Sequence, residues 1–429
     1  MLICHILLLS TIDPSLGRLT YESLSQQALM EMVIQHVSTH EQKRWTDDNG
    51  NFLDLDMWSG VKLNGEGCVQ KIDWADDIQY SKPTSHGKMS FEWLPETVEH
   101  VDISHRGSEG VFDAETLPKS LQVFYAVGNR LTGSFSLEKL PSGLTLLDLS
   151  DNEIAGTIQT SQKNASLERL MVGSNQLEGT IDLTDLPVTL KDFRCSSNTL
   201  TGSLNLCGLP KLMFSLFLHD NAFNGELDLT HLPEGMLELT LSQNKFSGPL
   251  NLTQLPERME YLNIAANQLS ESVDLDSLPK TLVQLGLEDN NFSGTVSLDN
   301  LPENLKYLTL SGNAFTGDVS LAKLPDNLEM LHLQDNQFDG RVILGALPPD
   351  LLELMLENNP LQEEVLLVDT GNTLWKGNSR DRANRVHMAA CMGGAGTTTD
   401  ESGGDLSSEG DDDEVLWDDD DESSDEDEE

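Results

Sequence analysis

The sequence of 429 residues is poor in basic side chains and contains no long apolar run. Lysine and arginine number 26 against 72 aspartates and glutamates, which gives a formal net charge of −46 at pH 7. A field of this sign repels phosphate backbones and anionic lipids, so we expect no nucleic-acid partner. Because no stretch of about eighteen consecutive apolar residues occurs, we also expect no membrane-spanning helix.

Cysteine is scarce as well, and its spacing excludes the common cysteine-based sites. The chain has five cysteines, and no two of them form a C-x-x-C pair: Cys4, Cys68, Cys195, Cys207 and Cys391. An odd number of widely separated thiols fits neither a disulfide framework nor a zinc site, so we expect no metal. This usage favours an intracellular location, cytoplasmic or nuclear, with secretion or the cell surface as the alternative.

Residues 1–17 bear on that alternative. A short apolar run from Leu2 to Leu9 is followed by the small residues Ser15 and Gly17, which is the pattern of a secretory signal. The run has no lysine or arginine before it, and His5 interrupts it. We interpret residues 1–17 as either a signal peptide or a disordered N-terminus.

Three residue types recur in register every 23 residues. The asparagine column consists of Asn129, Asn152, Asn175, Asn198, Asn221, Asn244, Asn267, Asn290, Asn313, Asn336 and Asn359. A proline column runs from Pro95 to Pro348 and is broken only at Asn164, and a glycine column runs from Gly110 to Gly340 with Glu271 as an exception. Asparagine, proline and glycine keep the same spacing relative to one another over about twelve units of 23 residues, which predicts a repeat architecture.

One unit shows what each position does. Leu308 and Leu310 alternate with polar residues, which predicts a short strand with its leucines inside. Asn313 follows where the chain must turn, and its amide can satisfy open backbone groups there, so stacked copies predict a buried asparagine ladder. Phe315 is expected in the core, and Gly317 allows a conformation that a side chain would hinder. Val319 and the alternation after it predict a second strand on the opposite side.

These residues resemble the leucine-rich repeat family, whose pattern is L-x-x-L-x-L-x-x-N-x-L, in its plant-like or protist subtype of 23 residues. The resemblance implies an α/β-class repeat solenoid, mainly β, in which about twelve coils form a curved horseshoe with a parallel concave sheet. On this basis residues 91–368 are assigned to the leucine-rich repeat solenoid.

Residues 18–90 are expected to cap the open end of the solenoid. Glu22 to Val37 carry apolar residues at helical spacing and predict an amphipathic helix. The motif W-x-G-V beginning at Trp58, followed by the segment ending at Ile72, resembles the N-terminal cap of plant repeat arrays. Such caps usually carry a cysteine where this chain has Leu63, so we expect no cap disulfide.

Residues 369–429 differ sharply in composition from the repeats. The segment from Asp400 to Glu429 contains 18 acidic residues and no basic one. It cannot bury enough apolar surface to fold, so we interpret residues 369–429 as a linker and a disordered acidic tail.

The sequence gives no positive sign of catalysis. No phosphate-binding glycine loop, metal pair or nucleophile–base set has its required context. We therefore expect neither an enzyme nor a cofactor site.

The outward positions of the predicted concave strands vary, whereas the inward ones hardly do. Large apolar and aromatic groups on a solvated sheet are typical of a binding surface. We expect a protein or peptide to bind the concave sheet through Tyr125, Met171, Arg194, Phe217, Tyr261, Tyr307, Met330 and His332.

Two alternatives remain open at the level of sequence. The acidic tail resembles that of the acidic leucine-rich nuclear phosphoproteins, which implies histone-binding, chaperone or phosphatase-regulating activity through basic partners. The plant-type cap and repeat instead resemble secreted or cell-surface recognition proteins. Of these readings, a non-catalytic interaction module using the concave sheet is the one that we favour.

Overall fold

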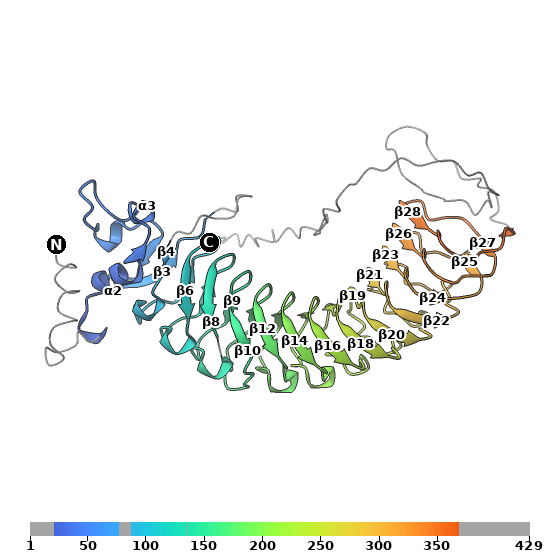
Figure 1. Cartoon of the computed structure of the whole chain (residues 1–429), viewed down its shortest axis with the longest axis horizontal. Helices are drawn as coiled ribbons and strands as arrows, with labels where there is room; N and C mark the ends of the chain where they lie inside the picture. The colour runs from blue at the N-terminus through green and yellow to red at the C-terminus, as the bar shows by residue number, and fades with distance from the viewer. Residues whose placement is uncertain (1–20, 77–86, 135, 369–429) are drawn as a thin grey trace, which may run out of the picture. The chain divides into compact units, whose positions relative to one another are not determined.

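The structure, a computed structural model, describes residues 21–76, 87–134 and 136–368 (Figure 1). These residues all belong to one compact unit, Met1–Cys391. The predicted signal segment and the acidic tail lie outside the described residues.

Each 23-residue unit forms one coil, and its leading strand pairs in parallel with the same strand of the next coil. Tyr307, Leu308 and Thr309, for example, pair with Met330, Leu331 and His332. The result is a 14-stranded sheet on the inner side of the row of coils, called the concave sheet below (Figure 1). Its strands are β2 (Val61–Leu63), β3 (Val69–Asp73), β5 (His100–Asp102), β7 (Val123–Tyr125), β9 (Leu146–Asp148), β11 (Arg169–Met171), β13 (Asp192–Arg194), β15 (Ser215–Phe217), β17 (Glu238–Thr240), β19 (Tyr261–Asn263), β21 (Gln284–Gly286), β23 (Tyr307–Thr309), β26 (Met330–His332) and β28 (Glu353–Met355).

The predicted mainly-β solenoid of about twelve turns is confirmed. Leu308 and Leu310 are fully buried, as are their counterparts up to Leu331 and Leu333, because the period of two in a strand sends both side chains inward. In the last coil Leu356 is only partly buried. Phe292, Phe315 and Phe338 follow one another in the core, and their ring centroids are 6.2 Å apart at each step. One coil therefore buries its apolar side chains mainly against its two neighbours.

Shorter sheets lie on the opposite side of the coils, where the prediction was only partly right. Three strands follow the glycine position as expected, and they form a sheet of their own: β25 (Val319–Leu321), β27 (Val342–Leu344) and β29 (Val365–Leu367). Most coils instead have a strand that follows the ladder asparagine and ends at or near the glycine position: β10 (Ala155–Thr157), β12 (Gln176–Gly179), β14 (Thr199–Gly202), β16 (Ala222–Gly225), β18 (Lys245–Gly248), β20 (Gln268–Glu271), β22 (Asn291–Gly294) and β24 (Ala314–Phe315). Of these, β10 begins three residues after Asn152, and β24 belongs to the same coil as β25.

A hydrogen bond between coils supports this earlier strand, and it recurs in the last coils as well. The backbone N–H of Phe292 donates to the Asn313 side chain of the next coil at 3.0 Å, which holds the chain extended there. Beyond the glycine, several coils in the first half of the array form short 3-10 turns. These turns are η4 (Ala114–Thr116), η5 (Leu137–Lys139), η6 (Leu183–Asp185) and η7 (Leu206–Gly208).

The glycine column has a conformational reason. Gly317 has φ +89°, in the left-handed region where a side chain is strained. Glu271 adopts the same region with φ +68° although it carries a side chain. The coil around Glu271 therefore tolerates a local cost in order to keep the repeat geometry.

The predicted helix at Glu22–Val37 was too long. The structure has α2 (Gln26–Val33), preceded by η1 (Tyr21–Ser23), and the chain then enters β1 (His36–Val37) and α3 (Thr39–Gln42). The Ser25 hydroxyl accepts the Ala28 N–H at 3.2 Å and so fixes the start of α2, a capping role that apolar periodicity alone does not reveal.

Strands of the cap extend two sheets of the solenoid, the concave sheet and a four-stranded sheet on the other side of the first coils. On one side β1 pairs antiparallel with β4 (Gly87–Lys88), which continues into β6 (Glu109–Phe112) and β8 (Arg130–Gly133). On the other side β2 and β3 form an antiparallel pair that extends the concave sheet. Two further 3-10 turns, η2 (Leu55–Met57) and η3 (Phe91–Trp93), complete this region.

Three tryptophans form the centre of the cap. Trp45 lies 5.7 Å from Trp58 and 4.6 Å from Trp74 between ring centroids. The indole N–H groups of Trp45 and Trp74 both donate to the Ser59 carbonyl, at 3.1 and 3.0 Å. This carbonyl satisfies two buried donors at once, and the aromatic cluster can therefore remain free of water.

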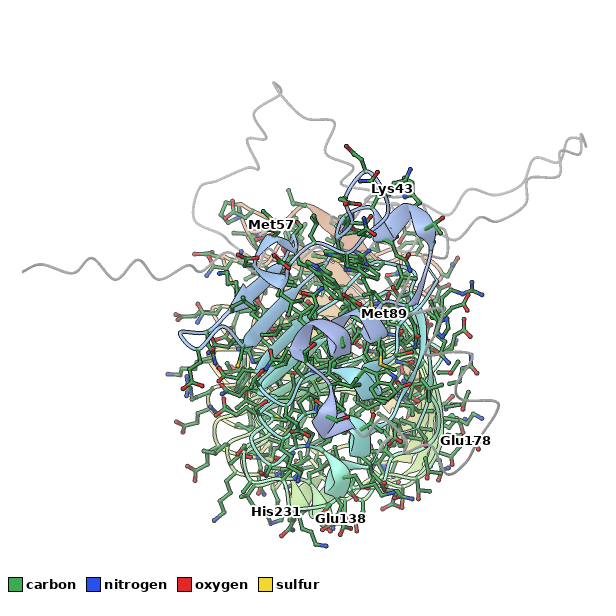
Figure 2. The ribbon with its side chains drawn as sticks, turned by 90° about the vertical axis from the view of Figure 1, so that its left-hand side faces the viewer. Lys43, Met57, Met89, Glu138, Glu178 and His231 are labelled. Carbon is green, nitrogen blue, oxygen red and sulfur yellow. The ribbon has the colours of Figure 1, made fainter. Side chains whose placement is uncertain are left out.

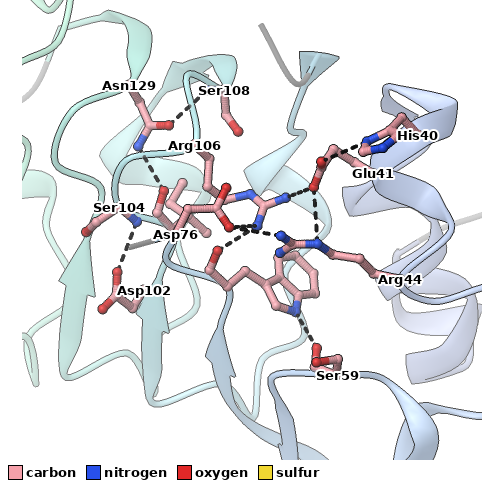
Figure 3. Close-up of polar contacts among 12 residues, drawn as sticks. His40, Glu41, Arg44, Ser59, Asp76, Asp102, Ser104, Arg106, Ser108 and Asn129 are labelled. Carbon is pink, nitrogen blue, oxygen red and sulfur yellow. Dashed lines mark hydrogen bonds and ion pairs between the residues drawn. The ribbon is translucent and has the colours of Figure 1, made fainter. Parts of the chain in front are cut away.

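Arg106 occupies the ladder position of the first coil and ties that coil to the cap (Figure 3). Its guanidinium is fully buried, donates to the Trp74 carbonyl at 2.7 Å and pairs with Glu41, while Asp76 lies 3.5 Å away. An asparagine could not reach these partners. The longer side chain is needed because the element before this coil is the cap and not another repeat.

Candidate protein-binding surface

The eight residues predicted to bind a partner all lie on the concave sheet, and seven of them are half-buried while Arg194 is exposed. They occupy the first and third positions of three-residue strands, whose middle residue points into the core. The pairing brings some of them together. Met171, Arg194 and Phe217 are consecutive in one row across β11, β13 and β15.

A cation–aromatic contact lies in that row. The guanidinium carbon of Arg194 lies 5.0 Å from the centroid of the Phe217 ring, and its Nε donates to Asp192 at 3.1 Å. His219 packs edge-on against Phe217, with ring centroids 6.3 Å apart. These contacts hold the phenyl ring on the sheet surface, with part of it open to solvent.

A tyrosine pair lies further along the sheet. Tyr261 and Tyr307 occupy the same row, with Gln284 between them and Met330 after them. The Tyr307 hydroxyl donates to Glu329 at 2.9 Å, and Lys306 lies 3.0 Å from the same carboxylate. Burial against the sheet raises the pKa of both tyrosines, so both hydroxyls remain hydrogen-bond donors across the physiological range.

The two remaining predicted residues extend these rows: Tyr125 lies in the row of Met171 with Asp148 between them, and His332 shares β26 with Met330. Tyr125 stacks obliquely on His100 at the first coils, with ring centroids 6.2 Å apart. His332 lies near the last coil, where its Nε2 is 3.0 Å from Glu353. The predicted set is thus distributed along the sheet and forms several contact points, not one pocket.

The prediction missed a group of acidic side chains between these contact points. Asp148 and Asp192 are buried at 8% and 3% exposure although they occupy outward positions, and Glu238 is half-buried next to Ser215. Burial raises the pKa of Asp148 and of Glu238. The sequence contains these acids in the outward columns, but it does not reveal that neighbouring side chains cover them.

The asparagine column forms a hydrogen-bonded ladder beside the concave sheet. The Nδ2 group of Asn244 donates to the carbonyls of Leu218, Leu241 and Ser242 at 3.0, 3.2 and 3.0 Å. Its Oδ1 accepts the Phe223 N–H of the preceding coil at 3.0 Å. The same four bonds recur at the other ladder asparagines, from Asn129 to Asn359.

The leucine-lined strand followed by this asparagine bend decides the architecture. The fold is that of the leucine-rich repeat proteins. Its coils satisfy their backbone groups through the next coil's asparagine, which is what the leucine-rich repeat pattern requires chemically.

Comparisons with known proteins identify no function. No protein-family model matches the sequence, and no curated protein matches it either. Among solved structures, the chain is similar to the plant peptide hormone receptor RGFR1 in complex with RGF2, at 20% identity and TM-score 0.41, over 62% of this chain and 61% of that one. It is also similar to YopM, a leucine-rich effector protein from Yersinia pestis, at 21% identity and TM-score 0.46, over 64% and 75% of the two chains. A leucine-rich repeat protein of Leptospira interrogans matches at 24% identity and TM-score 0.40, over 63% and 70%.

This chain matches only part of the receptor structures to which it is similar. It spans 61%, 58% and 62% of the lengths of three such structures. At these identities the likeness concerns the fold alone. Among the residues that the structure describes, no helix is long and apolar enough to cross a membrane.

Proposed function

We propose that this chain is a non-catalytic binding module whose concave sheet holds an extended peptide or a loop of a protein partner. The observation that carries the proposal is the row Met171, Arg194 and Phe217, followed along the sheet by Tyr261 and Tyr307. Each is half-buried or exposed and presents a large side chain outward. Rigid aromatic groups and arginines of this kind are the usual anchors of protein interfaces.

The dimensions support an elongated partner. The parallel strands are spaced by about 4.8 Å, so the twelve strands from β5 to β28 extend over roughly 50 Å. An extended peptide covers such a length with about fifteen residues at roughly 3.3 Å each. A surface of this size is large enough for a standard protein interface.

The charges favour a partner that contains basic residues. Among the outward positions of β5 to β28, the acids are Asp102, Asp148, Asp192, Glu238 and Glu353, and the two arginines are Arg169 and Arg194. A cationic side chain placed near Asp148 or Glu238 would stabilise a carboxylate that burial now disfavours. Apolar anchors beside half-buried acids therefore suit a peptide with alternating apolar and basic residues.

The proposal is tested by replacing Phe217, Tyr261 and Tyr307 together with aspartate and measuring capture of partner proteins by affinity purification. A matched control replaces three exposed apolar side chains outside the concave sheet, at Val111, Val188 and Leu212, with aspartate. We expect the first triple variant to lose its partners and the control to keep them. Equal capture by both variants would remove the concave sheet as the binding site.

The acidic tail supplies the competing explanation for any basic partner. Deletion of residues 392–429 separates the two, because the tail carries 18 of the chain's acidic residues. Binding through the concave sheet is expected to survive the deletion and moderate salt. A partner that is lost on both treatments would instead be bound by the tail, as exposed charges are strongly screened by salt.

A further inference from the structure

Among the described residues, one group of three side chains combines a thiol, a carboxylate and an imidazole: Cys207, Asp228 and His231. One ligand atom of each lies within 4.8 Å of the others, and all three residues are exposed. Figure 2 places His231 on the same edge of the coils as Glu138, which belongs to the 3-10 turn η5. The group is therefore separate from the concave sheet and does not depend on the proposed function.

The 23-residue repeat explains why these side chains meet. Cys207 lies in η7, and the equivalent position one coil later is Thr230. Asp228 and His231 stand on either side of Thr230 in the sequence, so coil stacking places them next to Cys207. No other pair of adjacent coils within the described residues combines these three residue types at these positions.

Asp228 is already oriented for binding. Its Oδ1 accepts the Thr230 N–H at 2.9 Å and the Thr230 hydroxyl at 2.6 Å. These bonds lower the pKa of Asp228 to about 2, so the carboxylate is ionised at neutral pH. The other oxygen, Oδ2, lies 3.4 Å from the Cys207 sulfur and 3.5 Å from Nδ1 of His231.

We propose that Cys207, Asp228 and His231 form a binding site for a zinc-type divalent cation, shared by two neighbouring coils. With bonds of about 2.3 Å to sulfur and about 2.0 Å to oxygen or nitrogen, tetrahedral geometry separates sulfur from oxygen by roughly 3.5 Å and nitrogen from oxygen by roughly 3.3 Å. The two observed separations from Asp228 are close to these values. The third pair, the Cys207 sulfur and an imidazole nitrogen of His231, lies within 4.8 Å, and both side chains are exposed.

The ligand set selects the class of metal. A thiolate and an imidazole favour zinc, cobalt or similar ions over calcium and magnesium, which prefer oxygen ligands alone. Three protein ligands leave a fourth position for water or for a group from another protein. Thr230 remains bonded to Asp228 and holds it in place, while its present 2.8 Å contact with His231 Nδ1 is exchanged for the metal.

Binding requires loss of a proton from the thiol. The thiolate and not the thiol is the metal ligand, and an ordinary cysteine is mostly protonated at neutral pH. The cation replaces that proton on sulfur, and one proton is released to solvent for each metal bound. Affinity is therefore expected to fall as the pH is lowered.

Cobalt(II) titration of the reduced full-length chain tests the site. Tetrahedral thiolate coordination gives a sulfur-to-cobalt charge-transfer band and intense visible bands, whereas the many carboxylates of the chain give neither. We expect one equivalent of cobalt to saturate these bands and zinc to displace it. The bands should disappear in Cys207→Ser, and the affinity should fall at least tenfold in Asp228→Asn and in His231→Gln.

Matched controls cover three of the other four thiols, the fourth being the fully buried Cys195. Cys68→Ser removes another thiol, which is free and half-buried, and a Cys4→Ser/Cys391→Ser variant removes the two outside the described residues. Both controls should keep the bands. Absence of the bands in the natural sequence, their survival in Cys207→Ser, or unchanged affinity in both the Asp228 and His231 variants would overturn the proposal.

Discussion

Removal of one ladder asparagine should destabilise the solenoid far more than removal of the exposed residue next to it. Asn244 is 8% exposed and makes four hydrogen bonds, three as donor to carbonyls and one as acceptor from the Phe223 N–H. In Asn244→Ala the Phe223 N–H has no acceptor, and an unsatisfied buried group costs about 1–3 kcal/mol. Loss of the bonds to Leu218 and its neighbours adds to this, so we expect about 2–4 kcal/mol in total.

The measurement is urea unfolding of the full chain, with Lys245→Ala as the control. Lys245 adjoins Asn244 and is exposed, so its replacement should change the free energy of unfolding by no more than about 0.5 kcal/mol. Because coils contact only their neighbours, Asn267→Ala should cost about as much as Asn244→Ala. Equal midpoints for Asn244→Ala and Lys245→Ala would refute the ladder argument.

Three other predictions concern positions where the structure departs from the repeat. Arg106→Met leaves the buried Glu41 carboxylate without its main partner, so urea unfolding should show a loss of about 3 kcal/mol that Glu41→Gln partly restores. Glu271→Gly relieves a left-handed φ and should raise the free energy of unfolding by about 1 kcal/mol in the same assay; no gain would show that the backbone there is unstrained. Burial raises the pKa of Asp148, so the folded chain holds the Asp148 proton more tightly than the unfolded chain does. The ionised carboxylate therefore lowers the free energy of unfolding by its full amount above the folded pKa and not at all below about pH 3.9, where the group is protonated in both states. Asp148→Asn should therefore stabilise the chain at pH 7 and have no effect at pH 3, and a gain that persists at pH 3 would contradict this cause.

The sequence predicted the inward side of the coils well because that side is constrained by a period. Leu308, Leu310 and Phe315 had to be buried once the 23-residue register was recognised, and they are. The same register marked the bend at Asn313. It did not reveal that the residue before each ladder asparagine takes a positive φ, as Ala266 does with φ +52°, because residues of many types occupy that column. Backbone conformation there is imposed by the bend and not by local preference.

The second strand and the cap helix were misplaced for a different reason. Alternation after Gly317 correctly marked β25, but it does not reveal the strand that follows the ladder asparagine, where residues such as Phe292 bond to the asparagine of the next coil. The helix at α2 was drawn too long because apolar spacing continues to Val37, whereas the Ser25 cap and the turn at Ile34 set its ends. Both errors come from contacts between segments that a single period does not describe.

The sequence prediction did not include the group of Cys207, Asp228 and His231, although the 23-residue register places these residues in neighbouring coils. The spacing between cysteines gives no sign of a site at Cys207, because its neighbours in space are 21 and 24 residues further along the chain. In a solenoid, separations near the repeat length are as close as i and i+4 in a helix. A ligand search that uses the repeat length as its spacing would have found Asp228 and His231 from the sequence.

The concave sheet contains acidic groups that the coil itself does not require. The outward position occupied by Asp148 is a threonine in other coils, at Thr240 and Thr309, and threonine suits a strand without the cost of burying a carboxylate. Residues that conflict with their surroundings are expected where a surface serves a purpose other than folding. A cationic partner would stabilise the ionised form of Asp148 on binding. Asp148→Asn is therefore expected to raise the free energy of unfolding but to weaken binding of the partner. If the variant is more stable at neutral pH but binds its partner less tightly, the carboxylate that destabilises the fold is the one that serves binding.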